Sequence, residues 1–359
     1  MTLAVSIAQI GSNNTTFRNR IINGAMVISQ RGTSAVTQTT TPAYTVDRWN
    51  IYGTVTSKYT AQQNSGSVTP PAGYINYLGI VSSSAYTVGT SERYEIRQAI
   101  EGLNVADLAW GTASAATVTL SFWVRSSLTG TFSGVIQNNA NDRTYPYTYT
   151  ISTANTWEQK TVTITGDTSG TWLTTNSVGI YVQFSMGAGA TYSGTAGAWT
   201  GTANVYGATG AVQVVATNGA TWYVTGVQLE AGSTASPFEY RSYGTELALC
   251  QRYYYQYTGN ASTQTPIASA FLASTVSAQG LLQFPVPMRT APTQTGSAAA
   301  DTEVTWSAGT STTSALTLDL ASTLNASLRI TTTGLTTGQG GYFRIAIGAT
   351  KYLAFSAEL

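Results

Sequence analysis

The chain has 359 residues, of which 42% are hydrophobic and only 9% are charged, and its formal net charge is +1. This length and hydrophobic content suit two domains with a sizeable core, while the weak charge gives no long-range field to attract nucleic acid or an anionic membrane. There is no histidine and a single cysteine, Cys250. Ser-His-Asp and Cys-His catalytic sites and an intrachain disulfide are therefore excluded, and a transition metal would find almost no ligands.

The opening residues predict neither an export signal nor a membrane span. MTLAVSIAQIGSNN lacks a basic start and a continuous apolar stretch, and no run approaches the roughly 18 apolar residues that span a bilayer. The composition is rich in hydroxyl and amide side chains, as in proteins found outside cells. Together these features fit a protein made in the cytoplasm and released by lysis, with no insertion into a membrane.

Period-two alternation dominates the chain and predicts β-strands. The clearest predicted strands are 116–127, 160–167, 177–186, 212–232 and 315–323. Asn218-Gly219 indicates a tight turn within the fourth of them, and residues 96–110 predict at most a short helix after a strand. Many short strands separated by turn signals are typical of an antiparallel sandwich, so the sequence predicts an all-β fold.

A helix is predicted between two β-domains. A boundary is expected near 230–244, and over 241–258 one apolar stripe would run along a helix through Tyr243, Leu247, Cys250 and Tyr254. Thr245 is the expected cap, with Glu246 in the first turn. Cys250 in this stripe is most simply a small buried hydrophobe, so the helix is interpreted as packing rather than as a site.

The chain then returns to strands over 259–359. The stretch 281–296 contains Pro285, Pro287 and Pro292, which restrict it to an edge strand or a connection. The polar, Gly-rich loops of this region are predicted from their residues to be ordinary hairpin turns.

Five segments in order resemble the jelly-roll carbohydrate-binding modules: NRIINGAMVISQRG (19–32), YTVDRWNI (44–51), ATVTLSFWVRSS (116–127), NTWEQKTVTITGD (155–167) and TWYVTGVQLEAG (221–232). PFEYRSYGTELALCQRYYYQY (237–257), followed by FPVPMRTAP (284–292) and a terminal FSAEL (355–359), is similar to the distal halves of tail-fibre and receptor-binding proteins of tailed bacteriophages. The likeness extends from Arg18 to Leu359.

This resemblance implies a jelly-roll β-sandwich over 18–240, a linking helix over 241–258 and a second, smaller β-sandwich over 259–359. It also implies a non-enzymatic host-recognition protein on the virion surface, displayed as a homotrimer and binding host surface polysaccharide. On this resemblance, the polar loops of 259–359 would face a receptor instead of serving as turns alone. Carbohydrate-binding jelly rolls often hold a structural calcium through an acidic residue after "NG". Here Ala25 follows Gly24, which puts that calcium in doubt, and no other cofactor is expected.

Fibre relatives carry a long shaft ahead of this region, whereas here only residues 1–17 precede it. These residues are expected to form an anchoring arm that binds other virion proteins of the tail or the capsid. Because such an arm could lie extended on a capsid or pair with a neighbour's sheet edge, a capsid decoration or cement protein is the alternative function.

Exposed aromatic residues are the expected ligand-binding groups, since the C–H face of a sugar ring packs on Trp or Tyr. Tyr145, Tyr147 and Tyr149 share one strand face and are either inter-strand packing or a ligand platform. The other candidates are Asn141, Trp172 and Trp199. Four further tryptophans lie in the family-like strands and are expected in the core: Trp49, Trp123, Trp157 and Trp222.

The acidic residues Glu92, Glu95 and Glu101 surround a predicted strand. Arg93, Glu95 and Arg97 alternate, so they are expected to share one sheet face and to pair, in a structural or sugar-hydrogen-bonding role. A polysaccharide depolymerase, which needs two carboxylates about 5–9.5 Å apart, is the minor alternative.

Overall fold

The computed structural model describes residues 17–359, and the chain divides into two compact units, Met1–Arg241 and Ser242–Leu359. The predicted arm over 1–17 lies outside the described residues except for Phe17. Within the described range, no helix combines the length and the apolar character that a bilayer crossing needs.

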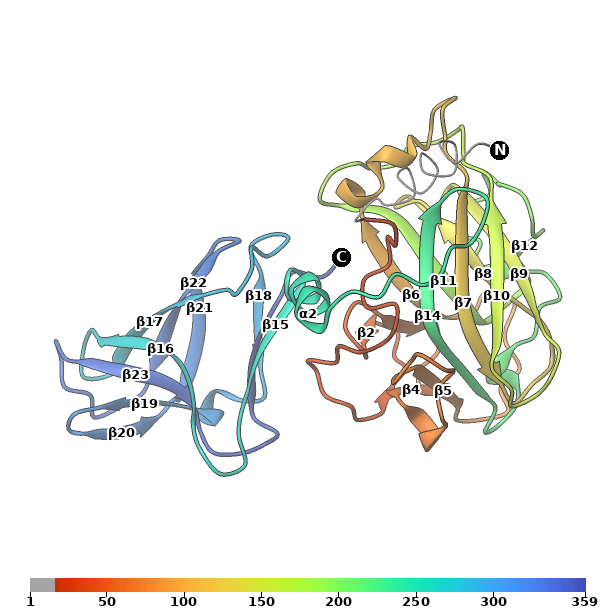
Figure 1. Cartoon of the computed structure of the whole chain (residues 1–359). Helices are drawn as coiled ribbons and strands as arrows, with labels where there is room; N and C mark the ends of the chain where they lie inside the picture. Colours follow the sequence, from red (N-terminus) through yellow and green to blue (C-terminus); the bar gives the residue numbers. More distant parts are fainter. Residues whose placement is uncertain (1–16) are drawn as a thin grey trace. The chain divides into compact units, whose positions relative to one another are not determined.

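The first unit is a β-sandwich of two six-stranded antiparallel sheets (Figure 1). Sheet A has the order β1-β4-β5-β14-β7-β10, with β1 (Val36–Thr37), β4 (Tyr59–Gln63), β5 (Leu78–Ser82), β14 (Thr221–Ala231), β7 (Val118–Ser126) and β10 (Glu158–Ile164). Sheet B has the order β2-β3-β6-β11-β8-β9, with β2 (Ala43–Tyr44), β3 (Asn50–Gly53), β6 (Arg93–Glu101), β11 (Val178–Ala188), β8 (Gly130–Gln137) and β9 (Thr144–Ile151). A short parallel pair, β12 (Ser193–Gly194) and β13 (Gly207–Ala208), completes the unit. The predicted all-β jelly-roll sandwich is confirmed.

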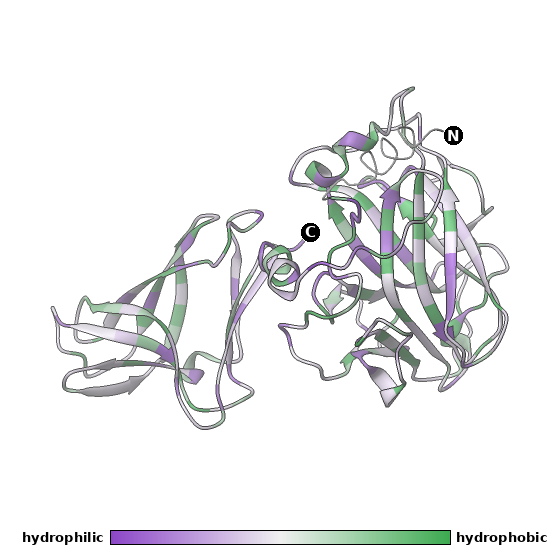
Figure 2. Cartoon of the chain, viewed as in Figure 1, coloured by the Kyte–Doolittle hydropathy of each residue, from purple (hydrophilic) through white to green (hydrophobic). Residues whose placement is uncertain are grey.

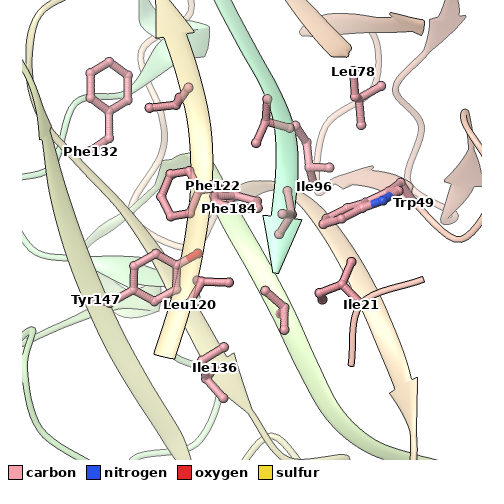
Figure 3. Packing of buried hydrophobic residues seen from close by; sticks show 14 of the residues in the cluster. Ile21, Trp49, Leu78, Ile96, Leu120, Phe122, Phe132, Ile136, Tyr147 and Phe184 are labelled. Atoms are coloured by element: carbon pink, nitrogen blue, oxygen red, sulfur yellow. The ribbon is translucent and has the colours of Figure 1, made fainter. Parts of the chain in front are cut away.

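Alternating strand residues build the core between the two sheets, as the hydropathy along the strands shows (Figure 2). Phe184 of β11 lies at its centre, with ring centroids 5.0 Å from Phe122, 5.1 Å from Trp222 and 6.3 Å from Trp49 (Figure 3). These rings come from both sheets and from widely separated parts of the chain. Burying so much aromatic surface in one cluster holds the two sheets together.

Gly24, in the Asn23-Gly24 pair of the segment 19–32, must be glycine because another part of the backbone approaches it closely. Gly24 accepts a hydrogen bond from Val227 N at 3.0 Å, and a Cβ placed on Gly24 would lie 2.1 Å from the Val227 carbonyl oxygen. Arg20 N likewise donates to Leu229 O at 2.9 Å. The closing strand β14 therefore returns beside this segment, and only glycine fits at the contact.

The second unit is also a β-sandwich with its own core. One sheet has the order β15-β24-β18, with β15 (Tyr254–Thr258), β24 (Tyr352–Ser356) and β18 (Thr293–Gly296). The other has the order β20-β19-β23-β16-β17-β22-β21, with β20 (Gly309–Thr312), β19 (Thr302–Trp306), β23 (Gly340–Ile345), β16 (Thr265–Leu272), β17 (Ser277–Gln283), β22 (Asn325–Thr331) and β21 (Ala315–Ala321). Its buried centre includes Leu272, Leu328, Phe343 and Phe355. The proline-rich stretch forms the connection from β17 to the edge strand β18.

The predicted helix is shorter than expected. Helix α2 covers Tyr243–Gln251, whereas Tyr254–Thr258 is strand β15, because the run YYQYT pairs with β24. The proposed stripe was wrong: Tyr243 is exposed and only Cys250 is deeply buried on the helix, as a small buried side chain. Since the helix begins two residues before Thr245, Ser242 caps it and accepts from Thr245 N.

Two further expectations, a strand from residue 212 and four core tryptophans, were wrong in part. Residues 212–220 form a short 3₁₀ turn at Val214–Ala216 instead of the start of a strand. The tight turn predicted at Asn218-Gly219 is present, with Ala220 N donating to Thr217 O at 3.1 Å. The short helix expected after a strand within 96–110 is also present, as the 3₁₀ turns Gly102–Asn104 and Ala106–Leu108 that follow β6. Trp49 and Trp222 are buried as expected, but Trp123 and Trp157 are only half-buried. Trp123 faces outward because Phe122 and Val124 take the inward positions of β7.

Candidate functional site

The three tyrosines of β9 lie on one face of the strand, as predicted, and that face points into the core. Tyr145, Tyr147 and Tyr149 are 8%, 1% and 6% exposed. The Tyr147 hydroxyl donates to Gln183 O at 2.8 Å, and Trp222 Nε1 donates to the Tyr149 hydroxyl at 2.9 Å. Burial raises the pKa of both phenols. The interpretation as a ligand platform was therefore wrong, and the stripe is packing.

Trp172 and Trp199 meet at one end of the same sandwich. Together with Trp110 they form a cluster of edge-to-face rings 4.7–5.4 Å apart, and Tyr145 lies 5.3 Å from Trp199. Each indole N–H already donates to a backbone carbonyl; Trp172 uses Ser169 O and Trp199 uses Thr165 O. Both side chains are half-buried, so they offer only part of one ring surface to a ligand.

Asn141 lies in the turn before β9 with a φ of 57°, and its Oδ1 is buried without a hydrogen-bond partner among the described residues. Its backbone carbonyl accepts from Asn204 N at 2.9 Å, which ties the turn to the loop that carries Trp199. Nearby, Arg143 makes a bidentate ion pair with Asp167 at 2.7 and 2.6 Å. The structure thus brings Asn141, Tyr145, Trp172 and Trp199 to one end of the sandwich, mostly as internal packing.

A second set of tyrosines lies on the outward face of sheet B. Arg93, Glu95 and Arg97 point outward from β6, while Tyr94 and Ile96 between them are core residues. Across the sheet, Tyr52 lies opposite Glu95, and both Asn50 and Gln183 lie opposite Arg97. The expectation that Arg93, Glu95 and Arg97 share a face and pair is confirmed. We call this surface the arginine–tyrosine face and define it by seven residues: Tyr52, Arg93, Glu95, Arg97, Tyr181, Tyr192 and Tyr206.

Each arginine of this face stacks on tyrosine rings. The Arg93 guanidinium carbon lies 3.4 Å from the Tyr206 ring centroid and 4.8 Å from that of Tyr52. The Arg97 guanidinium lies 4.9 Å from the Tyr181 ring centroid, and its Nε donates to Asn50 Oδ1 at 3.2 Å. Both arginine side chains remain 16% exposed. Stacking on aromatic faces therefore fixes two cations at a surface that solutes can reach.

Glu95 lies beneath the two arginines, and its buried carboxylate is not hydrogen-bonded to either of them. Its side chain is 1% exposed, and its carboxylate oxygens lie 3.4 Å from Arg97 Nη1 and 3.9 Å from Arg93 Nε. Among the described residues, neither carboxylate oxygen has a hydrogen-bond partner, and the same holds for Arg93 Nη1 and Gln183 Oε1. Buried polar atoms are nearly always paired. Beneath this face, several buried polar atoms of the described residues are therefore left without a hydrogen-bond partner.

A loop covers one part of the sheet's outward side. Ala208 N of β13 donates to Ser133 Oγ of β8 at 3.1 Å, and a Cβ on Gly207 would lie 3.0 Å from Ser185 Oγ. The loop thus lies against β8 and β11 and brings Tyr206 to Arg93. The part of the face over β3, β6 and β11 keeps the partly exposed arginines.

The tyrosines of this face were missed by the sequence reasoning, although a signal was present. In SVGIYVQFSM, the apolar residues Ile180, Val182 and Phe184 alternate with Tyr181, Gln183 and Ser185. The same alternation places Tyr52 on the outward side of β3. Tyr192 and Tyr206 reach the face through the loop, which no local pattern indicates.

Over residues 17–359, no three His, Cys, Asp or Glu side chains lie close enough together to hold a metal ion. The charged groups of the arginine–tyrosine face include only one carboxylate. The face therefore combines two cations and one carboxylate with aromatic rings.

No protein-family model matches the sequence, and no curated protein matches it. Solved structures with a similar fold include the enzymatically active domain of tailspike protein 4 of bacteriophage CBA120, with 11% identity and a TM-score of 0.33 over 60% of this chain. The alignment spans only 21% of that tailspike chain.

Two other similar structures are sugar-binding proteins by description. A putative sugar binding protein from Bacteroides thetaiotaomicron has 14% identity and a TM-score of 0.35 over 60% of this chain and 100% of its own. A family 11 carbohydrate-binding module from Clostridium thermocellum, solved with a mixed-linked tetrasaccharide, has 11% identity and a TM-score of 0.28 over 57% and 99%. At such identities and TM-scores these likenesses assign no function to this chain.

Proposed function

We propose that this chain is a non-enzymatic, glycan-binding host-recognition protein on the surface of a tailed-phage virion. The observation that carries the glycan-binding part is the arginine–tyrosine face, where aromatic rings, guanidinium groups and amides lie together on one side of a sheet. The ordered sequence resemblance from Arg18 to Leu359 supports the virion part, including a homotrimer. A chain with no histidine and few acidic residues suits binding better than turnover.

The chemistry of the face suits a saccharide. Tyr52 and Tyr181 present half-buried rings on which the C–H face of a sugar can pack. The partly exposed Arg97 stands beside Tyr181 as a donor for ring hydroxyls, held in place by its hydrogen bond to the buried Asn50. Because the stacked arginines are already ordered, little side-chain entropy is lost on binding, which favours affinity.

The test uses the purified full chain and polysaccharide extracted from the host surface. Tyr181→Ala should weaken binding about tenfold, equivalent to about 1.4 kcal/mol, because it removes a ring from the face. Tyr342→Ala, at an exposed tyrosine of the second unit, is the matched control and should bind as the wild type does. Isothermal titration supplies the affinities, and the wild-type protein should compete with phage adsorption.

Absence of binding to every host envelope fraction would contradict the proposal. Equal loss in both tyrosine variants would remove the arginine–tyrosine face as the site. A reducing-end assay on the same polysaccharide tests the non-enzymatic part. Sustained release of new reducing ends would show a depolymerase instead.

A further inference from the structure

We propose that the arginine–tyrosine face binds an acidic sugar, with the carboxylate of a glycan unit held by the guanidinium groups of Arg93 and Arg97. This inference rests on the proposed glycan-binding function and names the class of ligand that the same site would take.

The first argument is charge. Two guanidinium groups share the single carboxylate of Glu95, at 3.9 and 3.4 Å, so the face keeps one net positive charge. The other strands of sheet B, namely β2, β3, β8, β9 and β11, contain no charged residue, and neither does the covering loop 189–213. Glu101, the other acidic residue of β6, lies four residues beyond Arg97 and is buried with its own interactions. No acidic side chain of these segments therefore offsets the second arginine.

The second argument is unused hydrogen-bonding capacity. Over residues 17–359, the one hydrogen bond from the Arg97 side chain runs from Nε to Asn50. Glu95 is close enough to attract both guanidinium groups but does not hydrogen-bond either of them. It acts as a positioning residue that orders the arginines from below and leaves their outward N–H groups, on side chains that are 16% exposed, for a second anion. Guanidinium groups bind carboxylates with paired, charge-assisted hydrogen bonds.

The third argument is the surroundings of the two cations. Tyrosine rings lie against both guanidinium groups, and only 16% of each arginine side chain is exposed. Partial exclusion of water strengthens an ion pair relative to one in open solvent. The rings of Tyr52 and Tyr181 would at the same time receive the sugar ring that carries the carboxylate. A carboxylate attached to a sugar thus matches the face better than a neutral sugar or a free anion.

The test compares acidic polymers with their neutral counterparts. The probes are polygalacturonate, alginate, hyaluronan and polysialic acid, each also after reduction of its carboxyl groups to alcohols, with the full chain in affinity electrophoresis at low and high salt. At least one acidic polymer should bind about tenfold or more tightly than its reduced form, and added salt should weaken that binding. Arg97→Gln keeps a hydrogen-bonding side chain but removes the charge, so it should abolish this preference.

The matched control is Arg125→Gln. Arg125 of sheet A also stacks on a tyrosine, with its guanidinium 5.5 Å from the Tyr223 ring centroid, and donates through Nε to Asn155 O. Its variant should keep the preference for the acidic polymer.

Two outcomes separate this inference from the proposed function. If no acidic polymer of the panel binds better than its reduced form, while host polysaccharide binds and Tyr181→Ala weakens that binding, the acidic-sugar inference is overturned and the glycan-binding function stands. If host polysaccharide also fails to bind, both are overturned.

Discussion

Sheet B carries tyrosines on both of its sides, and the two sets do different things. On β9, Tyr147 and Tyr149 point into the core, and their hydroxyls bond to Gln183 O and to the Trp222 indole. On the outward side, Tyr52 and Tyr181 lie against arginines and stay half-buried. The same residue type therefore packs in the core on one side of the sheet and stacks on arginines on the other, where we propose recognition.

The difference lies in how completely the protein uses its own polar groups. Inside the sandwich, the hydroxyls of Tyr147 and Tyr149 have protein partners. On the outward side, the oxygens of Glu95 and an amino group of Arg93 have none among the described residues. An unpaired buried polar group costs about 1–3 kcal/mol, so the polar groups beneath the outward side are satisfied less well than those inside the sandwich.

The strongest way to break this comparison is Tyr147→Ala. Because the ring is buried in the central cluster (Figure 3), its loss should lower the free energy of unfolding by about 3–5 kcal/mol, as for other large aromatic residues in a core. Urea unfolding measures the effect. Thr148→Ala, at the exposed neighbouring position, is the control and should change it by less than about 0.5 kcal/mol. A Tyr147→Ala protein that is fully stable but no longer binds glycan would reverse the two roles.

Period-two patterns were enough to predict the all-β fold and to predict which residues share a face. They placed Tyr145, Tyr147 and Tyr149 together, and Arg93, Glu95 and Arg97 together. They did not say which face is inward, because tyrosine suits either environment. On β9 the opposite face carries Thr148 and Thr150, both exposed, and that polarity was the available clue.

The sequence could not predict which residues of separate strands come together in the arginine–tyrosine face, and the reason here is different. Tyr52, Glu95 and Tyr181 become neighbours only through the pairing of β3, β6 and β11, and strand order is a property of the whole fold. The extent of helix α2 was misjudged for a related reason. Its apolar stripe continued into YYQYT, but pairing with the distant strand β24 made that run a strand.

Tyr149→Phe sharpens the inward half of the comparison. It removes the hydroxyl that accepts from Trp222 Nε1 at 2.9 Å and leaves a buried donor without a partner. We expect the free energy of unfolding to fall by about 1–3 kcal/mol, measured in urea by the fluorescence of the tryptophans. Tyr145→Phe on the same strand is the control, because the Tyr145 hydroxyl has no hydrogen bond to any residue of 17–359, and its effect should be near zero. Equal losses in the two variants would show that the hydrogen bond to Trp222 adds nothing.

The smallest expected effect concerns Tyr94, which lies in the core like the inward tyrosines but contacts a charged group like the outward ones. Tyr94 is a core residue of β6 whose hydroxyl donates to the Glu92 carboxylate at 3.1 Å, together with the Tyr86 hydroxyl at 2.8 Å and Gly89 N at 3.0 Å. Burial alone would raise the pKa of Glu92, but these hydrogen bonds outweigh it and bring the pKa below its ordinary value of 4.5. A folded-state pKa below the unfolded one stabilises the fold above about pH 4.5, and this contribution is lost as the pH falls through the folded-state value.

Glu92→Gln should therefore make the free energy of unfolding fall less steeply below pH 4.5, by under about 0.5 kcal/mol since solvent screens this rim position. Urea unfolding of both proteins between neutral pH and the acid limb measures the difference. If the two curves run parallel, the tyrosine hydroxyls at the rim do not stabilise the ionised carboxylate, and Tyr94 belongs with the apolar core alone. If they converge at low pH, inward tyrosines support a charge at the margin of the core just as the outward ones support the arginines.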